Sequence, residues 1–243
     1  MQDRRTIVIT GGAIGLGREL TRIYCEQRHR VFICGRTEVA LEEVRAMHPE
    51  AVPVCADLGD PDGRSRFLDA IHEQEGSVDL LIHNAALQFS HNFADGCTPV
   101  ERIETEVLVN LLAPIELTTE LLPLLGQSSE GRVVFISSAL ARVPKKSAPV
   151  YCATKAGLSN FARALRYQLE ETSTRVTEVV PDLIVTRMAA GRGDKALSAF
   201  EAAQKIVSGI AKGENEIRLG RVPMLYALHR ILPDLAYRIL KAA

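Results

Sequence analysis

The sequence predicts an α/β fold, a doubly wound parallel sheet of about seven strands with helices on both faces. Short apolar runs alternate with longer amphipathic stretches along the chain, which is typical of repeated strand and helix units. The first apolar run leads through a glycine-rich turn into a helix. No linker or break in composition interrupts the 243 residues, so we expect one domain over 1–243 with a sizeable core.

Composition excludes several classes of protein. A net charge of −1 argues against binding to nucleic acid or to an anionic membrane. No signal peptide and no apolar run of roughly 18 residues is recognised, so we expect a cytoplasmic protein without an integral membrane segment. The five cysteines have neither metal-site nor disulfide spacing and are expected to be reduced packing residues. We therefore expect no metal site.

The first predicted strand and helix enclose a candidate nucleotide site. Residues 5–10 form the strand, 18–28 form the helix, and the turn Gly11-Gly12-Ala13-Ile14-Gly15-Leu16-Gly17 lies between them. Glycines let the backbone approach a pyrophosphate, and a helix start offers free N–H groups and the positive end of its dipole. The turn is therefore predicted to bind a dinucleotide.

The second strand, 30–35, indicates which dinucleotide. A carboxylate after this strand would bind the ribose 2′-hydroxyl of NAD and repel the 2′-phosphate of NADP. Here Gly35 stands in that place and Arg36 follows, whose guanidinium suits a phosphate. We therefore predict NADP(H), with NAD(H) less favoured; the alternative is that Arg36 is only a solvated turn residue.

The remaining elements follow the same alternation. They are a helix over 37–48 capped by Thr37, a strand 51–55, a helix 67–75, a strand 78–82, a helix 100–125, a strand 132–137, a helix 150–171, a strand 175–180, a helix 196–211, a strand 216–220 and an amphipathic tail 222–240.

Asn110 lies inside an apolar part of the helix 100–125. A polar side chain is costly to bury without partners, so specific hydrogen bonds are expected there.

Three residues near the middle of the chain suggest proton transfer. Tyr151 and Lys155 are four apart in a predicted helix and therefore share a face. A nearby cation lowers a phenol pKa from about 10 by roughly 1 to 3 units, so Tyr151 could exchange a proton near neutral pH. Ser138 ends a buried strand, where α/β folds place ligands, and could bind the same substrate oxygen. The alternative is that Tyr151 and Lys155 only pack or solubilise the helix.

These motifs together resemble the short-chain dehydrogenase/reductase family. The resemblance covers almost the whole chain, weakens after about residue 185, and is carried by Thr10, Gly11, Gly15, Gly17, Ser138, Tyr151 and Lys155. It implies a Rossmann-like fold and an oxidoreductase that transfers hydride between a nicotinamide cofactor and a carbonyl or alcohol. Within the family, the segments 33–36 and 150–155 and the residue Asp182 are similar to those of DltE-like oxidoreductases.

The resemblance implies a role for each catalytic residue. Tyr151 would donate the proton, Ser138 would polarise the carbonyl, and Lys155 would lower the Tyr151 pKa and contact the nicotinamide ribose. Asn110 would hold a water that completes a proton relay with Lys155. The alternative for Asn110 is a core residue whose hydrogen bonds are all satisfied.

The resemblance also assigns the cofactor-binding residues. They are Thr10, Gly11, Gly12, Ile14, Gly15, Gly17, Gly35, Arg36, Asp57, Leu58, Asn84, Ala85, Ala86, Tyr151, Lys155, Pro181, Val185 and Thr186. Asp57 would accept the adenine amino group, or it would only form a turn. Ile14 lacks the second positive charge that some members have there. His83 replaces a family asparagine, and we expect it to hydrogen-bond at the strand end rather than act as a base.

Two departures from the family pattern leave a second function open. Ala86 replaces a glycine and adds a methyl group beside the cofactor. Asp182 also replaces a glycine, so we expect a less favourable φ there or a carboxylate that affects the substrate pocket. The alternative to an enzyme is a catalytically idle NADP(H)-binding sensor or scaffold protein.

The C-terminal part has the least specific pattern. Residues 186–211 resemble a substrate lid. The tail 222–243 is open to three interpretations: a docking helix, a subunit interface, or a surface anchor giving peripheral membrane association. The resemblance implies a small-molecule carbonyl or alcohol substrate and a homo-oligomer, either a dimer or a tetramer.

Overall fold

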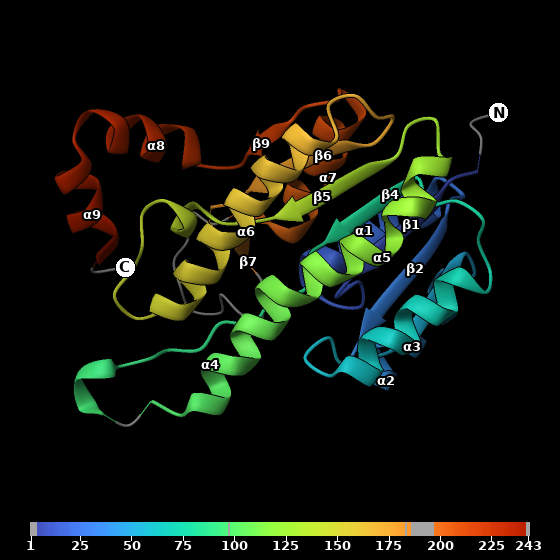
Figure 1. Cartoon of the computed structure of the whole chain (residues 1–243), viewed down its shortest axis with the longest axis horizontal. Coiled ribbons are helices and arrows are strands. Elements are labelled where there is room, and N and C mark those ends of the chain that lie inside the picture. Colours follow the sequence, from blue (N-terminus) through green and yellow to red (C-terminus); the bar gives the residue numbers. More distant parts are fainter. Residues whose placement is uncertain (1–3, 97, 183, 186–196, 242–243) are drawn as a thin grey trace.

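Seven parallel strands form one sheet at the centre of the computed structural model, which describes residues 4–96, 98–182, 184–185 and 197–241 (Figure 1). The strand order is β3-β2-β1-β4-β5-β6-β9, and each neighbouring pair is parallel. The strands are β1 (Thr6–Thr10), β2 (Arg30–Gly35), β3 (Ala51–Cys55), β4 (Leu80–His83), β5 (Arg132–Ile136), β6 (Arg175–Val180) and β9 (Glu216–Arg218). The predicted fold class is confirmed.

Helices cover both faces of this sheet. One face carries α1 (Gly15–Glu26), α2 (Glu38–Met47) and α7 (Ala199–Ala211); the other carries α3 (Pro61–His72), α5 (Ala113–Gln127) and α6 (Pro149–Gln168). The further helices are α4 (Val100–Val107), α8 (Val222–Ile231) and α9 (Pro233–Lys241). The shorter elements are the 3-10 turns η1 (Phe93–Asp95) and η3 (Ala139–Ala141), the π-helical turn η2 (Leu108–Leu112), and the parallel pair β7 (Ile184–Val185) and β8 (Leu197–Ser198).

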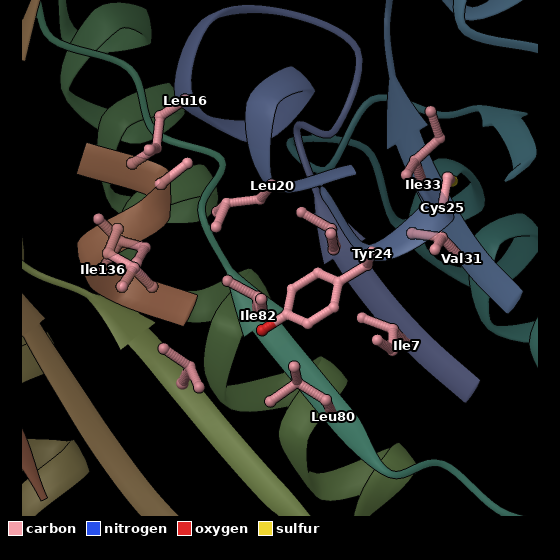
Figure 2. Close-up of a cluster of buried hydrophobic side chains, with 14 of the residues drawn as sticks. Ile7, Leu16, Leu20, Tyr24, Cys25, Val31, Ile33, Leu80, Ile82 and Ile136 are labelled. Carbon is pink, nitrogen blue, oxygen red and sulfur yellow. The ribbon is translucent and has the colours of Figure 1, made fainter. Parts of the chain in front are cut away.

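The core lies on both sides of the sheet because its strands are apolar along their whole length. In β1, Ile7 and Ile9 face the layer of α1 and α7, whereas Val8 faces the layer of α3 and α5; all three are at most 1% exposed. Figure 2 shows the ring of Tyr24 from α1 reaching across the first layer toward Leu80 and Ile82 of β4. Because both faces of the sheet are buried, the strands are continuous apolar runs in the sequence.

Three predicted helices differ from those observed. The helix expected over 67–75 begins at Pro61, because Asp60 accepts a hydrogen bond from the Asp62 N–H and proline suits a first helical position. Thr37 occupies the N-cap position of α2, but its side chain makes no capping hydrogen bond. The helix expected over 100–125 is α4, the π-helical turn η2 and α5 in succession.

This composite helix also corrects the expectation that no long apolar segment exists. From Val100 to Gln127 the helix is long and apolar enough to span a membrane, and 39% of its most apolar window is buried. Leu117, Leu121 and Leu125 of α5 are fully buried in the core against the sheet. Core helices often pass the same test of length and composition, so this one helix is weak evidence of a membrane segment.

The predicted lid is only partly described. Its first part, 186–196, lies outside the described residues. In its second part, α7 packs Ala202, Ala203 and Ile206 against α1 with no exposed surface. This half of the predicted lid is therefore part of the core, because its apolar face covers the sheet.

Candidate active site

A cleft of about 380 Å³ opens at the carboxyl ends of β1 to β4. The connections after β1 and after β4 run to opposite sides of the sheet, so the strand order reverses here, and open α/β sheets bind ligands at such a point. Ten residues predicted to bind the cofactor line the cleft: Gly11, Ile14, Gly15, Gly35, Arg36, Asp57, Leu58, Asn84, Ala85 and Ala86. The lining residues that sequence reasoning missed are Ala13, Leu16, Arg18, Cys34, Thr37, Ala40, Ala56, Leu87 and Val109.

The glycines of the first turn have two different functions. Gly11 and Gly15 line the cleft with positive φ values of 65° and 55°, which side chains rarely adopt. Gly12 and Gly17 lie behind the cleft lining, where a Cβ would stand 2.5 Å from the Ile33 side chain and 2.1 Å from the Gly11 carbonyl oxygen, respectively. The second pair therefore allows the helix to pack closely, and the first pair shapes the surface open to a ligand.

Thr10, predicted to contact the cofactor, has a structural role at the end of β1. Its side chain accepts hydrogen bonds from the backbone N–H groups of Asn84 and Ala85, each at 3.0 Å, and the residue is 2% exposed. The Asn84 amide donates in return to the carbonyls of Thr10, at 3.0 Å, and of Gly11, at 3.2 Å. These bonds fix the end of β1 to the end of β4 at the base of the cleft.

Two guanidinium groups lie at the β2 end of the cleft. Arg36 follows β2, and its Nη1 is 3.8 Å from Asp57 Oδ2; Arg18 comes from α1, and its Nη1 is 3.4 Å from Glu43 Oε2. Each pair is largely exposed, so solvent screens the attraction and it contributes little stability. Arg18 follows Ile14 by four residues and so shares its helix face, a signal from which the sequence could have placed a second cation here.

Asp57 forms a turn, and its side chain also lies in the cleft. Its Oδ1 accepts a hydrogen bond from the Gly59 N–H at 2.9 Å, which confirms the turn-forming role. The same side chain also lines the cleft, together with the buried Leu58. The arrangement leaves the second carboxylate oxygen facing Arg36.

Lys155 carries a buried charge at the start of α6. The residue is 2% exposed, and Nζ donates a hydrogen bond of 2.7 Å to the carbonyl of Ile136 at the end of β5. Burial lowers the pKa of this ammonium from 10.5 to about 8, so most of it stays protonated at neutral pH. Nζ lies 5.7 Å from the centroid of the Tyr151 ring, which confirms that the two predicted side chains are neighbours.

Ser138 follows β5 directly, as predicted. Its Oγ accepts a hydrogen bond from the Leu140 N–H at 3.1 Å and so caps the turn η3. That bond uses an acceptor lone pair and leaves the hydroxyl hydrogen to be donated. The hydroxyl of the neighbouring Ser137 instead donates to Glu178 at 2.7 Å and lies 3.1 Å from the Val179 carbonyl, which confirms that Ser137 points away.

Asn110 has its hydrogen bonds satisfied by protein groups. It is fully buried in η2, where Oδ1 accepts from the Leu87 N–H at 2.7 Å and Nδ2 donates to the Leu87 carbonyl at 2.7 Å. Nδ2 also donates to Thr154 Oγ1 at 3.3 Å, and that hydroxyl donates to the Tyr151 carbonyl at 2.9 Å. Both amide hydrogens are thereby used. Asn110 thus connects the cleft wall at Leu87 to the helix that carries the tyrosine.

The end of β6 departs from expectation at Asp182. Its carboxylate accepts hydrogen bonds from Arg221 Nε at 2.7 Å and Nη2 at 3.4 Å. Among the described non-glycine residues only Arg28 has a positive φ, so the unfavourable backbone expected for Asp182 is absent there. The Pro181 carbonyl accepts a hydrogen bond from the Ala139 N–H, and Val185 belongs to β7. Thr186 lies outside the described residues.

His83 has the hydrogen-bonding role predicted for it. Its Nε2 lies 2.8 Å from Thr118 Oγ1, and because that hydroxyl donates to the Pro114 carbonyl at 2.7 Å, we assign the proton to Nε2. The ring is stacked on Phe135, with ring centroids 5.0 Å apart. Burial, with a smaller contribution from the Lys155 charge, lowers the pKa of His83 to about 3. The ring is therefore neutral and is not placed as a base.

The fold and the site define a class of protein. A glycine turn at the switch point of a parallel sheet, with a buried ammonium facing a tyrosine and bonded to the end of the strand that a serine follows, is the architecture of a dinucleotide-dependent oxidoreductase. The chain belongs to the short chain dehydrogenase family, whose model matches residues 5–196. The resemblance inferred from the sequence is confirmed, and the protein is a dehydrogenase/reductase.

Individual relatives agree with this family. The chain is 32% identical to the uncharacterized oxidoreductase DltE of Bacillus subtilis, over 89% of this chain and 88% of that protein. It is 29% identical to dehydrogenase/reductase SDR family member 7B of Mus musculus, over 96% and 79% of the two chains. A short chain dehydrogenase from Burkholderia cenocepacia, solved in complex with NADP, has a TM-score of 0.86 at 23% identity, with 99% of each chain covered.

The burial of neutral His83 predicts sensitivity to acid. In the unfolded chain an ordinary histidine binds a proton below about pH 6.5, whereas folded His83 stays neutral down to about 3. The free energy of unfolding should therefore fall, by about 1 kcal/mol per pH unit, as the pH drops below about 6.5. His83→Asn should remove this slope, measured by urea unfolding at several pH values. The exposed His72→Asn is the control, and equal slopes in wild type and His83→Asn would contradict the assignment.

Proposed function

We propose that this protein transfers a hydride between NADP(H) and a carbonyl or alcohol substrate. The observation that carries the proposal is the buried Lys155 ammonium beside Tyr151, at the strand end next to the dinucleotide cleft. Burying a charge is costly, and perturbed ionisable groups are concentrated at catalytic sites. A charged lysine that faces a phenol has an evident chemical use here, whereas in a purely structural core it would only destabilise the fold.

The residues of the cleft fit NADP(H). Gly11 and Gly15 leave room for a pyrophosphate near the start of α1, and Gly35 adds no carboxylate at the end of β2. Arg36 and Arg18 are two cations that would bind a 2′-phosphate. Two structures of the same fold agree: the Burkholderia protein is in complex with NADP, and a short-chain dehydrogenase from Sphingobium yanoikuyae is in complex with NADPH.

In the proposed reaction the protein moves a proton while the bound nicotinamide supplies or accepts the hydride. During reduction Tyr151 donates its phenolic proton to the substrate oxygen, and the Ser138 hydroxyl donates a hydrogen bond to the same oxygen. The positive charge of Lys155 stabilises the phenolate that remains on Tyr151. During oxidation the same groups act in the opposite sense.

Asn110 is proposed as a positioning residue. Its amide holds the Leu87 backbone by two hydrogen bonds and reaches Thr154, whose hydroxyl holds the backbone of Tyr151. Both amide hydrogens are used, so the structure favours the satisfied-core interpretation over a relay water bound by these hydrogens. The consequence is a fixed distance between the cleft wall and the proton donor.

The first test replaces the proposed proton donor. Tyr151→Phe should lower turnover by about a hundredfold or more, because general acid catalysis contributes that much, and should leave NADPH binding nearly unchanged. The control is Tyr167→Phe, on the exposed end of the same helix. Turnover would be measured as NADPH oxidation with a panel of carbonyl compounds, and binding as NADPH fluorescence. Unchanged turnover in Tyr151→Phe would refute the role; tight NADPH binding with no turnover of any carbonyl would instead favour a sensor or scaffold.

The second test addresses the choice of cofactor. Gly35→Asp places a carboxylate at the end of β2, where an added Cβ has its nearest neighbour at 3.7 Å and so fits without strain. The ratio of NADPH to NADH affinity should fall by about tenfold or more, through repulsion of the 2′-phosphate and binding of the 2′-hydroxyl. Gly76→Asp, at a position with open space around it, is the matched control. A wild type that prefers NADH would contradict the NADP(H) proposal.

A further inference from the structure

The helices α8 and α9 form a hairpin that follows the edge strand β9 and projects away from the sheet (Figure 1). One side of α8 is held to the body of the protein by Val222 and Tyr226, which are 1% and 7% exposed and pack with Ala139 and Val180. The rest of the hairpin lies outside the two main core clusters. The side of the hairpin that faces away from the body is therefore formed by side chains of α8 and α9 alone.

The outer surface of the hairpin is apolar. On α8, Met224 and Ile231 share the face opposite Tyr226 and are 68% and 75% exposed. At the start of α9 and along it, Leu232 and Ile239 are 52% and 51% exposed, with Leu235 between them at helical spacing. A helix such as α8 that is apolar on opposite faces is normally covered on both. Exposed apolar side chains concentrated on one small element in this way mark a protein or membrane interaction site.

Cations surround this apolar surface. The hairpin from Arg221 to Lys241 contains four arginines and lysines and a single carboxylate, Asp234, although the whole chain has a net charge of −1. A groove of about 380 Å³ lies between α9 and the loop after η3, lined by Pro144, Lys145, Lys146, Tyr237, Arg238 and Lys241. Its lining contains four cationic side chains and no acid. Within the described part of the chain, Lys146, Arg238 and Lys241 form no ion pair.

We propose that the α8–α9 hairpin docks on an anionic phospholipid surface. The apolar residues would enter the boundary between head groups and acyl chains, and the groove lysines and arginines would bind lipid phosphates. A second copy of the chain fits less well, because a symmetric contact would bring the same cations face to face. This inference is independent of the reaction proposed above.

The docking surface is held in place before any partner binds. His229 and Tyr237 join the two helices by a hydrogen bond of 3.0 Å and an edge-to-face ring contact. Tyr226 lies between two guanidinium groups, with Arg142 and Arg218 at 4.4 Å and 5.4 Å from its ring centroid. Arg142 belongs to the loop that begins at Ser138, so the hairpin and the catalytic serine share one supporting segment. Binding would therefore cost little ordering of the hairpin.

Vesicle sedimentation of the full chain tests the proposal. Wild type should pellet with vesicles of phosphatidylcholine containing phosphatidylglycerol, and much less with phosphatidylcholine alone. Arg238→Gln with Lys241→Gln should weaken this binding by about fivefold per charge removed, which corresponds to about 1 kcal/mol each. Ile231→Ser with Ile239→Ser should weaken it by at least about tenfold, because both side chains lose their apolar contact with lipid.

Matched controls lie on α2, near the opposite edge of the sheet (Figure 1). Val39→Ser and Arg45→Gln also change exposed side chains, at 69% and 65%, and should bind vesicles like wild type. Thermal unfolding checks that every variant is folded, and light scattering reports oligomeric state. No binding to anionic vesicles, equal binding to neutral ones, or hairpin variants that bind like the controls would overturn the proposal. Loss of an oligomer in the apolar variants without loss of vesicle binding would identify a contact between copies instead.

Discussion

The site depends on one buried ammonium. Lys155 has lost nearly all its solvent, and its ammonium donates a hydrogen bond to the carbonyl of Ile136, the last residue of β5. Removing a charge from water is costly, so α6 and β5 must be held at the spacing that this bond requires. Gly157, two residues beyond Lys155, lets α6 pack closely on η2, because a Cβ there would stand 3.3 Å from the Leu111 side chain. The bond from Asn110 to Thr154 joins the same two elements.

Strand order brings this ammonium to the cofactor cleft. β4 lies between β1 and β5 in the sheet. The segments that follow these three parallel strands are therefore neighbours at the carboxyl ends of the strands. The segment after β1 is the glycine turn, that after β4 contains Asn84, and that after β5 contains Ser138. The bonds between Thr10 and Asn84 join the first two, and Asn110 joins the second to α6. The proposed dinucleotide site and the proposed proton donor thus become adjacent without any long-range loop.

The parts of the fold that local sequence patterns determine, namely the strands and the glycine turn, were predictable from the sequence. Strands buried on both faces are continuous apolar runs, and the glycine turn has a fixed position between strand and helix, so the sheet was predicted correctly and ten of the predicted cofactor residues line the cleft. Contacts between side chains that are distant in the sequence could not be predicted in the same way. No pattern indicates that the Thr10 hydroxyl binds backbone N–H groups just after β4, that Asp182 binds Arg221, or that α7 packs into the core. Arg18 was accessible in principle, since it stands one helical turn after Ile14.

The most direct test of this account is the pKa of Lys155 itself. The chain has seven lysines, so carbon-13 labelling at lysine Cε gives few NMR signals, and Lys155→Met identifies the one of interest. The account predicts that this signal titrates with a pKa of about 8, well below that of an exposed lysine, because the ammonium is buried against the Ile136 carbonyl. A signal that titrates near 10.5, as an ordinary lysine does, would show that the charge is solvated and would contradict the central claim.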